Sequence, residues 1–274
     1  RPAKVPEGLR EIIVKRIGFI LLCFLTLLCS SLTADIAIYG DTRSDENTHR
    51  KVIAAITAHK PEIAFHTGDL NQKGILQSEY DSFFQIVKPL TDICPLYPAK
   101  GNHEKSRDLF LNNFPALKGS AYYSLVYDGI KFIVLDSTDD LSPGSPQYHW
   151  LKRAVADSLP AILIMHHPVF SSGYHGDELG LQLWLPQMLA STNVKAVFCA
   201  HDHGYERSEY KGISYIISGG GGAPLREQGN TNPHSLVFNL SYHYIIAKHE
   251  AGKLECKVWD IDNSLLDSFT LSGF

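Results

Sequence analysis

The sequence predicts an α/β protein in which two mixed β-sheets form a layered sandwich flanked by helices. Short apolar runs alternate with segments of helical periodicity over most of the chain, as expected where strands and helices succeed one another. Strand-like runs then follow one another to the end of the chain. Elements of these two kinds pack as layers around a shared apolar core.

The elements of the first part are delimited by apolar runs and by proline. Residues 48–59 carry Val52, Ile53 and Ile56 at helical spacing, and Pro61 ends this helix. Residues 78–87 likewise place their aromatic side chains on one helical face. The predicted strands here are residues 36–39, 63–67 and 95–99, and the predicted helices are residues 48–59, 78–87 and 105–113.

A β-hairpin is the clearest signal in the middle of the chain. Residues 122–126 and 130–135 flank Asp128 and Gly129, a pair that favours a tight hairpin turn. The following elements are predicted as helices at 147–158 and at 179–189, interrupted at Pro186, and as strands at 161–165, 194–200 and 213–218. The last strands are predicted at residues 236–240, 244–249, 254–259 and 265–271.

The first 34 residues have the order of a secretory signal. Lys15 and Arg16 precede the apolar run 17–29, and small polar residues follow at 30–34. The run is shorter than the roughly 20 residues that a membrane span needs, although a retained anchor is the alternative. Val14 is a possible true start. We therefore expect an exported protein, periplasmic or secreted, with residues 35–274 as one domain and no stable membrane association after cleavage.

Charge and composition exclude several classes of protein. Hydrophobic residues make up 44% of the chain and charged residues 20%, which is ordinary for a globular protein and excludes disorder. The net charge is −4, and removal of residues 1–34 would leave −7. Such a chain is not expected to bind long nucleic acid, which requires a basic face. Positive charge for an anionic substrate must then be local, as a bound metal would provide.

Polar side chains that can bind a metal ion follow five of the predicted strands. They are Asp41, Asp69, Asn102 with His103, His166, and the pair His201 and His203. The carboxyl ends of strands in α/β sheets line a common crevice, so these side chains can converge although they are far apart in sequence. Each alone is more simply a turn residue or a helix cap. Their repetition at successive strand ends favours a functional site.

The chemistry of this set is that of a metal centre. Carboxylates, imidazoles and an amide oxygen bind Zn, Mn or Fe ions. A carboxylate shared by two cations offsets their repulsion and holds them roughly 3.5–4 Å apart. Two such cations hold a bridging water as hydroxide near neutral pH and clamp the oxygens of a phosphoryl group during in-line attack.

These motifs together resemble the signature of the calcineurin-like metallophosphoesterases. The matching stretches are Gly40-Asp41, Gly68-Asp-x4-Gly74, Gly101-Asn-His-Glu104, His166-x-Pro168 and His201-x-His203. The stretch from His201 to Ser208 and the later Tyr215-Ile-Ile-Ser-Gly-Gly-Gly-Gly222 are similar to the narrower purple acid phosphatase branch. The resemblance extends from about residue 36 to residue 271 and implies the metallophosphoesterase fold.

The resemblance also implies roles for individual residues. It implies two divalent or trivalent transition metal ions, Fe, Mn or Zn. Asp41 and His203 would bind the first ion and Asp69 would bridge, while Asn102, His166 and His201 would bind the second. His103 would not be a ligand but would stabilise charge on phosphate or protonate the leaving oxygen. His175 follows His166 at the spacing of a substrate-facing histidine, so it is either a general acid or an exposed loop residue.

Two departures from the family pattern affect the first metal position. The wider family has Asp-x-His where this chain has Asp41-Thr-Arg43, and the purple branch has a tyrosine where this chain has Gln72. Without the tyrosinate we expect no purple colour. Water, Asn71 or Gln72 replaces the missing ligand, or the first ion binds weakly. Arg43 either contacts the substrate phosphate, which its guanidinium fork matches, or turns away to Asp45 or Glu46.

The sequence therefore predicts an exported dinuclear phosphoesterase that hydrolyses small phosphate monoesters. A phosphodiesterase or nucleotide hydrolase is the alternative within the enzymes. A non-catalytic module that binds phosphate or a partner is the alternative outside them, because a fold does not fix a function. The substrate and the oligomeric state stay open.

Overall fold

A computed structural model describes residues 34–274, which form one compact unit. The predicted signal segment, residues 1–34, lies outside the described residues except for Ala34, the first residue of β1. Among the described helices, none has both the length and the apolar composition that a bilayer crossing requires.

The two sheets of the predicted sandwich are present, and both are mixed. The first has the order β13-β12-β11-β1-β2-β3, in which β1, β2 and β3 are parallel and β11 is antiparallel to β1. Its strands are β1 (Ala34–Tyr39), β2 (Ile63–His66), β3 (Leu96–Pro98), β11 (His243–Glu250), β12 (Lys253–Asp260) and β13 (Leu265–Ser272).

The second sheet has the order β10-β8-β9-β7-β6-β5-β4, in which β5, β6, β7 and β9 are parallel. Strand β4 is antiparallel to β5, β8 is antiparallel to β9, and β10 is antiparallel to β8. Its strands are β4 (Tyr123–Tyr127), β5 (Ile130–Val134), β6 (Ala161–Ile164), β7 (Val194–Cys199), β8 (Tyr205–Tyr210), β9 (Ile213–Ser218) and β10 (Ser235–Asn239).

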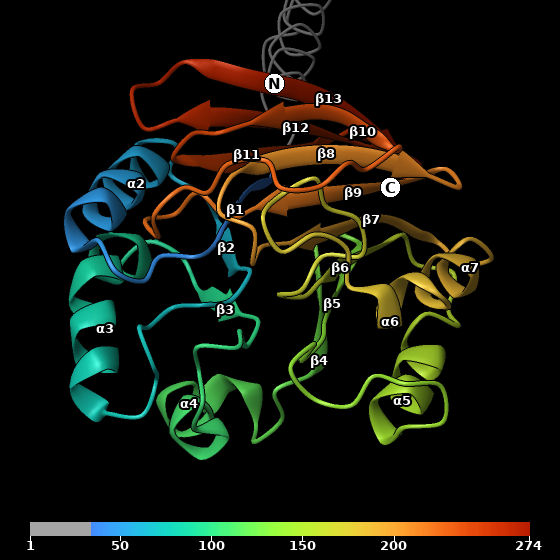
Figure 1. Cartoon of the computed structure of the whole chain (residues 1–274), viewed down its shortest axis with the longest axis horizontal. Helices are drawn as coiled ribbons and strands as arrows, with labels where there is room; N and C mark the ends of the chain where they lie inside the picture. Colours follow the sequence, from blue (N-terminus) through green and yellow to red (C-terminus); the bar gives the residue numbers. More distant parts are fainter. Residues whose placement is uncertain (1–33) are drawn as a thin grey trace, which may run out of the picture. The chain divides into compact units, whose positions relative to one another are not determined.

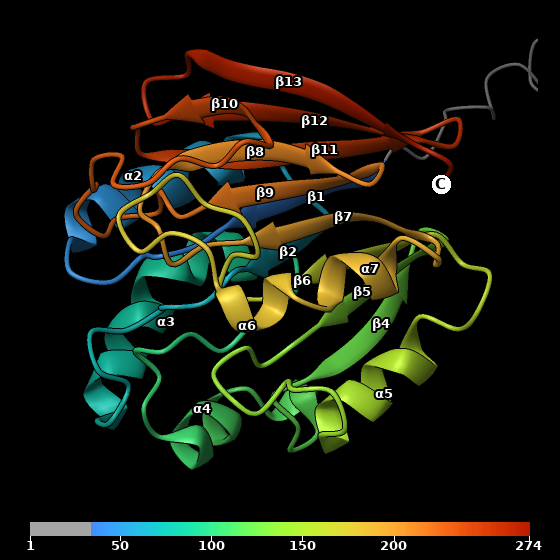
Figure 2. The ribbon, with the colours of Figure 1, turned by 45° about the vertical axis from the view of Figure 1, so that its right-hand side comes forward.

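Helices cover the outer face of each sheet. In Figure 1 α2 and α3 lie along one side of the molecule and α5, α6 and α7 along the other, and Figure 2 shows the sheets between them. The helices are α2 (Glu46–Ala58), α3 (Gln77–Thr91), α4 (Arg107–Asn113), the 3₁₀ turn η1 (Pro115–Leu117), α5 (Pro146–Ala154), α6 (Leu179–Gln182) and α7 (Leu185–Leu189). Asp45 caps α2 by accepting from the backbone N–H of Asn47 and Thr48.

The apolar core lies in three layers. The central layer joins the facing sides of the two sheets, where Phe65 of β2 stacks on Phe132 of β5 with ring centroids 4.4 Å apart. A second layer holds α2, α3 and α4 on the first sheet, and a third holds α5, α6 and α7 on the second. This packing fixes where each strand ends, and so fixes the loops that carry the predicted site.

Most predicted elements are confirmed, with two corrections. The hairpin of β4 and β5 turns at Asp128 and Gly129, both with positive φ. Residues 205–210 form β8, which the sequence analysis treated only as part of a motif. The segment 179–189 is two short helices, and Pro186 stands in the first turn of α7, where a missing backbone N–H costs nothing.

Candidate metal centre

The two aspartates of the first sheet follow β1 and β2 in an unusual backbone conformation. Asp41 has φ 54° and Asp69 has φ 58°, a left-handed region that few non-glycine residues adopt. Hydrogen bonds hold the two turns against each other, from Asp41 N to Gly68 O (3.0 Å) and from Thr42 N to Asp69 O (3.1 Å). The two carboxylates are therefore brought side by side by backbone geometry.

Two glycines allow backbone to approach these carboxylates. A Cβ atom at Gly101 would lie 2.2 Å from Asp69 Oδ1, and one at Gly219 would lie 2.5 Å from Asp41 Oδ2. No side chain fits at such distances. The loop after β3 and the glycine-rich stretch after β9 thus close the two sides of the centre.

The ligands predicted for the second metal form a tight cluster. Asn102 Oδ1 lies 2.9 Å from His166 Nε2 and 3.0 Å from His201 Nδ1, and the two imidazole nitrogens are 3.2 Å apart. Asp69 Oδ1 lies 3.4 Å from His166 Nε2. Ligand atoms about 2.1 Å from a shared cation are themselves roughly 3.0–3.4 Å apart, so the spacing of this cluster fits one bound ion.

The proton positions in the cluster also fit a cation. His166 Nδ1 donates to the carbonyl oxygen of Thr67 (3.0 Å), which leaves Nε2 as an unprotonated acceptor. That nitrogen faces Asn102 Oδ1 and Asp69 Oδ1, which also accept rather than donate. Three acceptor atoms turned toward one another repel unless a cation lies between them.

The ligands predicted for the first metal are Asp41, Asp69 and His203. His203 Nδ1 donates to the carbonyl oxygen of Pro224 (2.7 Å), so its Nε2 is an acceptor as well. Both carboxylate oxygens of Asp41 are buried without a hydrogen-bond partner among the described residues, as a metal ligand would be when its ion is absent. The donor set therefore fits a cation here too.

Arg43 reaches this first position. Its Nε lies 3.3 Å from Asp69 Oδ2, and its Nη2 lies 3.4 Å from His203 Nε2. It does not pair with Asp45, which caps α2, or with Glu46, which lies 3.6 Å from Arg50. Of the two predicted orientations of Arg43, the structure has the one that faces the site.

Burial controls the pKa values of these groups. Burial, with a further contribution from the charge of Asp69, holds the pKa of Asp41 well above its usual value. Burial also lowers the pKa of His166 and lowers that of His203 to about 4. The imidazoles are thus neutral at ordinary pH, as metal ligands must be.

His103 borders the centre from the loop after β3. Its backbone N–H donates to Asp69 Oδ1 (2.9 Å), and its Nδ1 donates to the carbonyl oxygen of Gln72 (2.5 Å). Its Nε2 lies 3.8 Å from Asp69 Oδ2, so this nitrogen faces the centre. The side chain is a neighbour of the ligands and can exchange a proton with a group bound between them.

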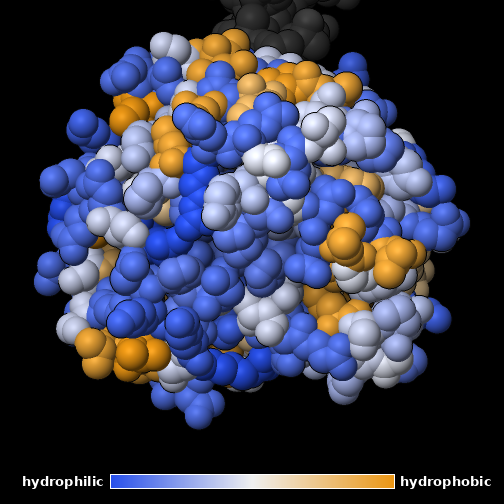
Figure 3. Space-filling view, viewed as in Figure 1, coloured by the Kyte–Doolittle hydropathy of each residue, from blue (hydrophilic) through white to orange (hydrophobic). Residues whose placement is uncertain are grey.

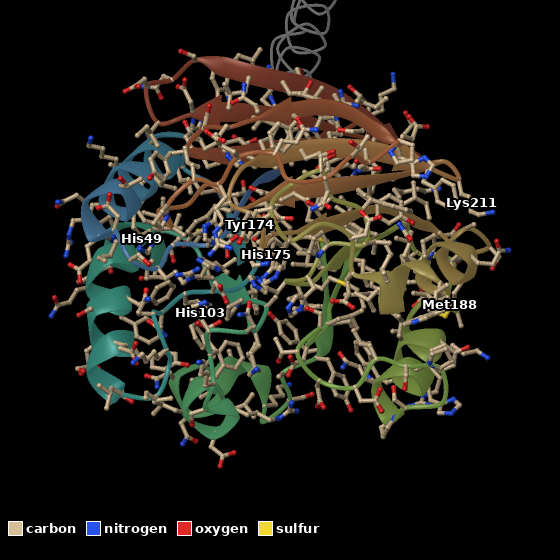
Figure 4. The ribbon with its side chains drawn as sticks, in the orientation of Figure 1. His49, His103, Tyr174, His175, Met188 and Lys211 are labelled. Carbon is tan, nitrogen blue, oxygen red and sulfur yellow. The ribbon has the colours of Figure 1, made fainter. Side chains whose placement is uncertain are left out.

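His175 borders the centre from the loop after β6. Its ring lies against that of His201, with centroids 4.2 Å apart, and Arg226 contacts its Nε2. Asp202 accepts from the backbone N–H of His175 (2.8 Å) and so anchors the loop. In Figure 4 His103 and His175 approach the same central region from different loops. His175 is both exposed and at the site, so the two predicted alternatives are not exclusive.

Gln72 and Asn71, the predicted replacements for the missing ligand, turn to other partners. Gln72 Oε1 accepts from the hydroxyl of Ser44 (2.7 Å). Asn71 donates its backbone N–H to Glu104 (3.1 Å), and its buried Nδ2 has no partner among the described residues. The side-chain oxygen of Gln72 therefore does not join Asp41 and His203.

Sequence reasoning assigned no role to three further residues that shape the centre. Glu104 accepts from the backbone N–H of Asp69, Asn71 and Gly101, and burial, with the charge of Asp69, raises its pKa to about 8. Asp202 anchors the loop of His175. His167 lies within ligand reach of His166 and His201. Each lies within two residues of a predicted ligand in sequence, which is the signal that could have identified it.

The surface around the centre is polar. Figure 3 shows hydrophilic residues across the middle of the face that carries the site, and apolar residues chiefly toward the rim. A cavity of about 610 Å³ adjoins Arg43 between the loops after β1 and β2 and helices α2 and α3. Ser44, His49, Asn71 and Phe83 are among the residues that line it. The setting suits a small polar ligand.

Comparisons with known proteins agree with this fold and motif set. The family model described as calcineurin-like phosphoesterase matches residues 34–205. Purple acid phosphatase 18 of Arabidopsis thaliana is 28% identical over 165 residues, which cover 52% of this chain and 37% of that protein. Probable inactive purple acid phosphatase 1 of the same plant is 26% identical over 290 residues, covering 85% of this chain and 47% of that protein.

A solved structure extends the likeness to the whole fold. The purple acid phosphatase PPD1 from seeds of yellow lupin, Lupinus luteus, superimposes with a TM-score of 0.76 at 20% identity, covering 89% of this chain and 54% of that one. The chain spans less than half the length of three curated relatives that it matches. From the family match, the motifs and the fold together, the chain belongs to the calcineurin-like phosphoesterase family, in its purple acid phosphatase-like branch.

Proposed function

We propose that the protein is a metal-dependent hydrolase of small phosphate monoesters. The observation that carries this proposal is the cluster of Asp69, Asn102, His166 and His201, whose acceptor atoms face one another at the spacing of ligands around a cation. The guanidinium of Arg43 and the imidazoles of His103 and His175 border that cluster. Phosphoryl transfer requires such groups to position the phosphate and to stabilise its charge.

Two ion positions share Asp69 in this proposal. Asn102, His166 and His201 would hold one ion, and Asp41 and His203 the other, with carboxylate and imidazole donors that suit Fe, Mn or Zn. Bound ions would polarise the phosphoryl oxygens and supply a nucleophilic water at neutral pH. This two-ion form is the state proposed for protein in excess metal.

The remaining residues would act on the substrate directly. Arg43 would contact phosphate oxygens, because its planar fork matches their geometry. In its imidazolium form, with protons on both ring nitrogens, His103 would donate the Nε2 proton to the leaving oxygen as the bond from phosphorus to that oxygen breaks. His175 would hydrogen-bond a phosphate oxygen as a neutral ring, since burial and the nearby Arg226 lower its pKa.

Monoesters are preferred over diesters on the strength of the relatives, several of which are named purple acid phosphatases. Others among them are named probable inactive purple acid phosphatases, which keeps a non-catalytic binding module as the second candidate. Residues 1–34 run from basic to apolar to small polar residues, which supports export of the protein. The acidic net charge disfavours long nucleic acid as a partner.

The purified protein should hydrolyse p-nitrophenyl phosphate faster than bis-p-nitrophenyl phosphate. Chelation should abolish this activity, and Mn²⁺ or Zn²⁺ should restore it, because the clustered acceptors need a cation. Release of p-nitrophenol is the measurement. A preference for the diester would favour the phosphodiesterase. Absence of turnover on either substrate in protein that retains metal would favour the binding module.

His103→Asn should lower kcat more for an alkyl phosphate than for p-nitrophenyl phosphate, because only the poor leaving group depends on a proton donor. The loss on the alkyl ester should be on the order of 10²–10⁴-fold. The matched control is His175→Asn, which should lower kcat on both substrates by a similar factor. Equal losses for both substrates in His103→Asn would remove His103 as the proton donor.

A further inference from the structure

The two ion positions differ in what faces their ligands. At the position of Asn102, His166 and His201, no arginine or lysine nitrogen of the described residues contacts a ligand atom, and the acceptors are turned toward one another. At the position of Asp41 and His203, a cationic side chain is already present. Arg43 directs Nε to Asp69 Oδ2 and Nη2 to His203 Nε2, which are the atoms that the first ion would bind.

Arg43 is held in this place by its surroundings. Its side chain is only 9% exposed. Nη1 donates to the hydroxyl of Ser44 (3.3 Å), and that hydroxyl donates in turn to Gln72 Oε1 (2.7 Å). Gln72, which was a predicted replacement ligand, thus supports the arginine through Ser44 instead.

We infer that Arg43 competes with the first metal ion for Asp69 and His203, so that the centre binds one ion tightly and a second only weakly. At low metal concentration the guanidinium supplies the second positive charge of the centre. This inference rests on the metal centre of the proposed function. It adds the order in which the two ions bind to that centre.

Electrostatics and ligand count support the inference together. A divalent ion that approaches Asp69 and His203 meets a fixed positive charge within contact distance of both, and like charges in a partly buried site repel strongly. Gln72 is bound to Ser44, so it adds no ligand to Asp41, Asp69 and His203 at the first position. The unpartnered oxygens of Asp41 keep some affinity for a cation, so binding is weakened rather than abolished.

Metal binding to wild-type protein and to Arg43→Met tests the inference. Methionine removes the charge while keeping an unbranched side chain. Equilibrium dialysis against Mn²⁺ and, separately, Zn²⁺, followed by elemental analysis, gives stoichiometry and affinity. Wild-type protein should bind one equivalent tightly and a second at least about tenfold more weakly. Arg43→Met should tighten the second equivalent at least about tenfold and leave the first nearly unchanged.

Arg226→Met is the matched control. It removes the same charge from the same site, but the guanidinium of Arg226 contacts His175, and the bond from its backbone N–H to the carbonyl oxygen of His203 is kept in the variant. It should change the second affinity much less than Arg43→Met does. Arg43→Gln is the second variant, in case thermal unfolding shows that Arg43→Met is not folded, and it should also tighten the second equivalent.

Two equivalents bound with equal affinity by wild-type protein would overturn the inference, as would an unchanged second affinity in both Arg43 variants. These results would leave the proposed hydrolase standing. Metal binding is measured without substrate. A protein that binds its two ions in this order but hydrolyses no phosphate ester would therefore contradict the proposed hydrolase and leave the inference about Arg43 intact. Wild-type protein that binds neither ion would overturn both.

Discussion

Asp69→Asn should lower kcat by about 10³-fold or more while the protein remains folded. The carboxylate of Asp69 faces both ion positions, with Oδ1 3.4 Å from His166 Nε2 and Oδ2 3.3 Å from Arg43 Nε. Asparagine keeps the size of the side chain and one acceptor oxygen, but it removes the negative charge that offsets the surrounding cations.

The measurement is kcat on p-nitrophenyl phosphate together with metal content after dialysis. Asp81→Asn is the control, because Asp81 lies on the exposed face of α3 and contacts Gln77 only. This control should keep full activity and full metal content. Undiminished turnover in Asp69→Asn would exclude the shared carboxylate from the mechanism.

Glu104→Ala should destabilise the protein by about 3–5 kcal/mol. The buried carboxylate accepts from the backbone N–H of Asp69 (3.1 Å), Asn71 (3.1 Å) and Gly101 (2.9 Å), and alanine would leave all three donors without an acceptor. The same bonds join the loop of Asp69 to the loop of Asn102, so metal affinity should also fall. Glu104 is therefore a positioning residue rather than a ligand.

Denaturant unfolding of protein stripped of metal gives the stability change without a contribution from bound ions. Glu104→Gln should be intermediate, because the amide keeps one acceptor oxygen but turns an NH₂ group toward the remaining donors. Zn²⁺ affinity, measured by dialysis of Glu104→Gln, then separates the effect of Glu104 on metal binding from its effect on stability. A decrease of less than about 1 kcal/mol in the free energy of unfolding of Glu104→Ala would show that the three backbone donors find other partners.

The sequence predicted the sandwich because its elements are strongly patterned. Continuous apolar runs such as residues 161–164 and 196–199 lie in buried strands, and the Asp128-Gly129 turn specifies its hairpin. Residues 205–210 were missed because charged residues alternate there with aromatic and small ones. In the structure Arg207 of β8 forms a salt bridge with Asp267 of β13. This contact is long-range in sequence, so no local pattern reveals it.

The site was predictable as a set of residues but not as a geometry. The spacing of polar residues after strands located Asp41, Asp69 and His201, yet nothing in the sequence shows that all three adopt positive φ. Such strained backbone persists only where surrounding hydrogen bonds impose it. The direction of Arg43 was equally open, because it depends on Ser44 and Gln72 on two different loops.

The central claim is that the acceptors of Asp69, Asn102, His166 and His201 enclose a metal ion. Anomalous X-ray diffraction from crystals loaded with one equivalent of Zn²⁺ tests it most directly. We expect one strong anomalous peak roughly 2.0–2.2 Å from Asn102 Oδ1, His166 Nε2 and Asp69 Oδ1. A peak elsewhere, or none in protein that hydrolyses phosphate esters at full rate, would contradict the claim.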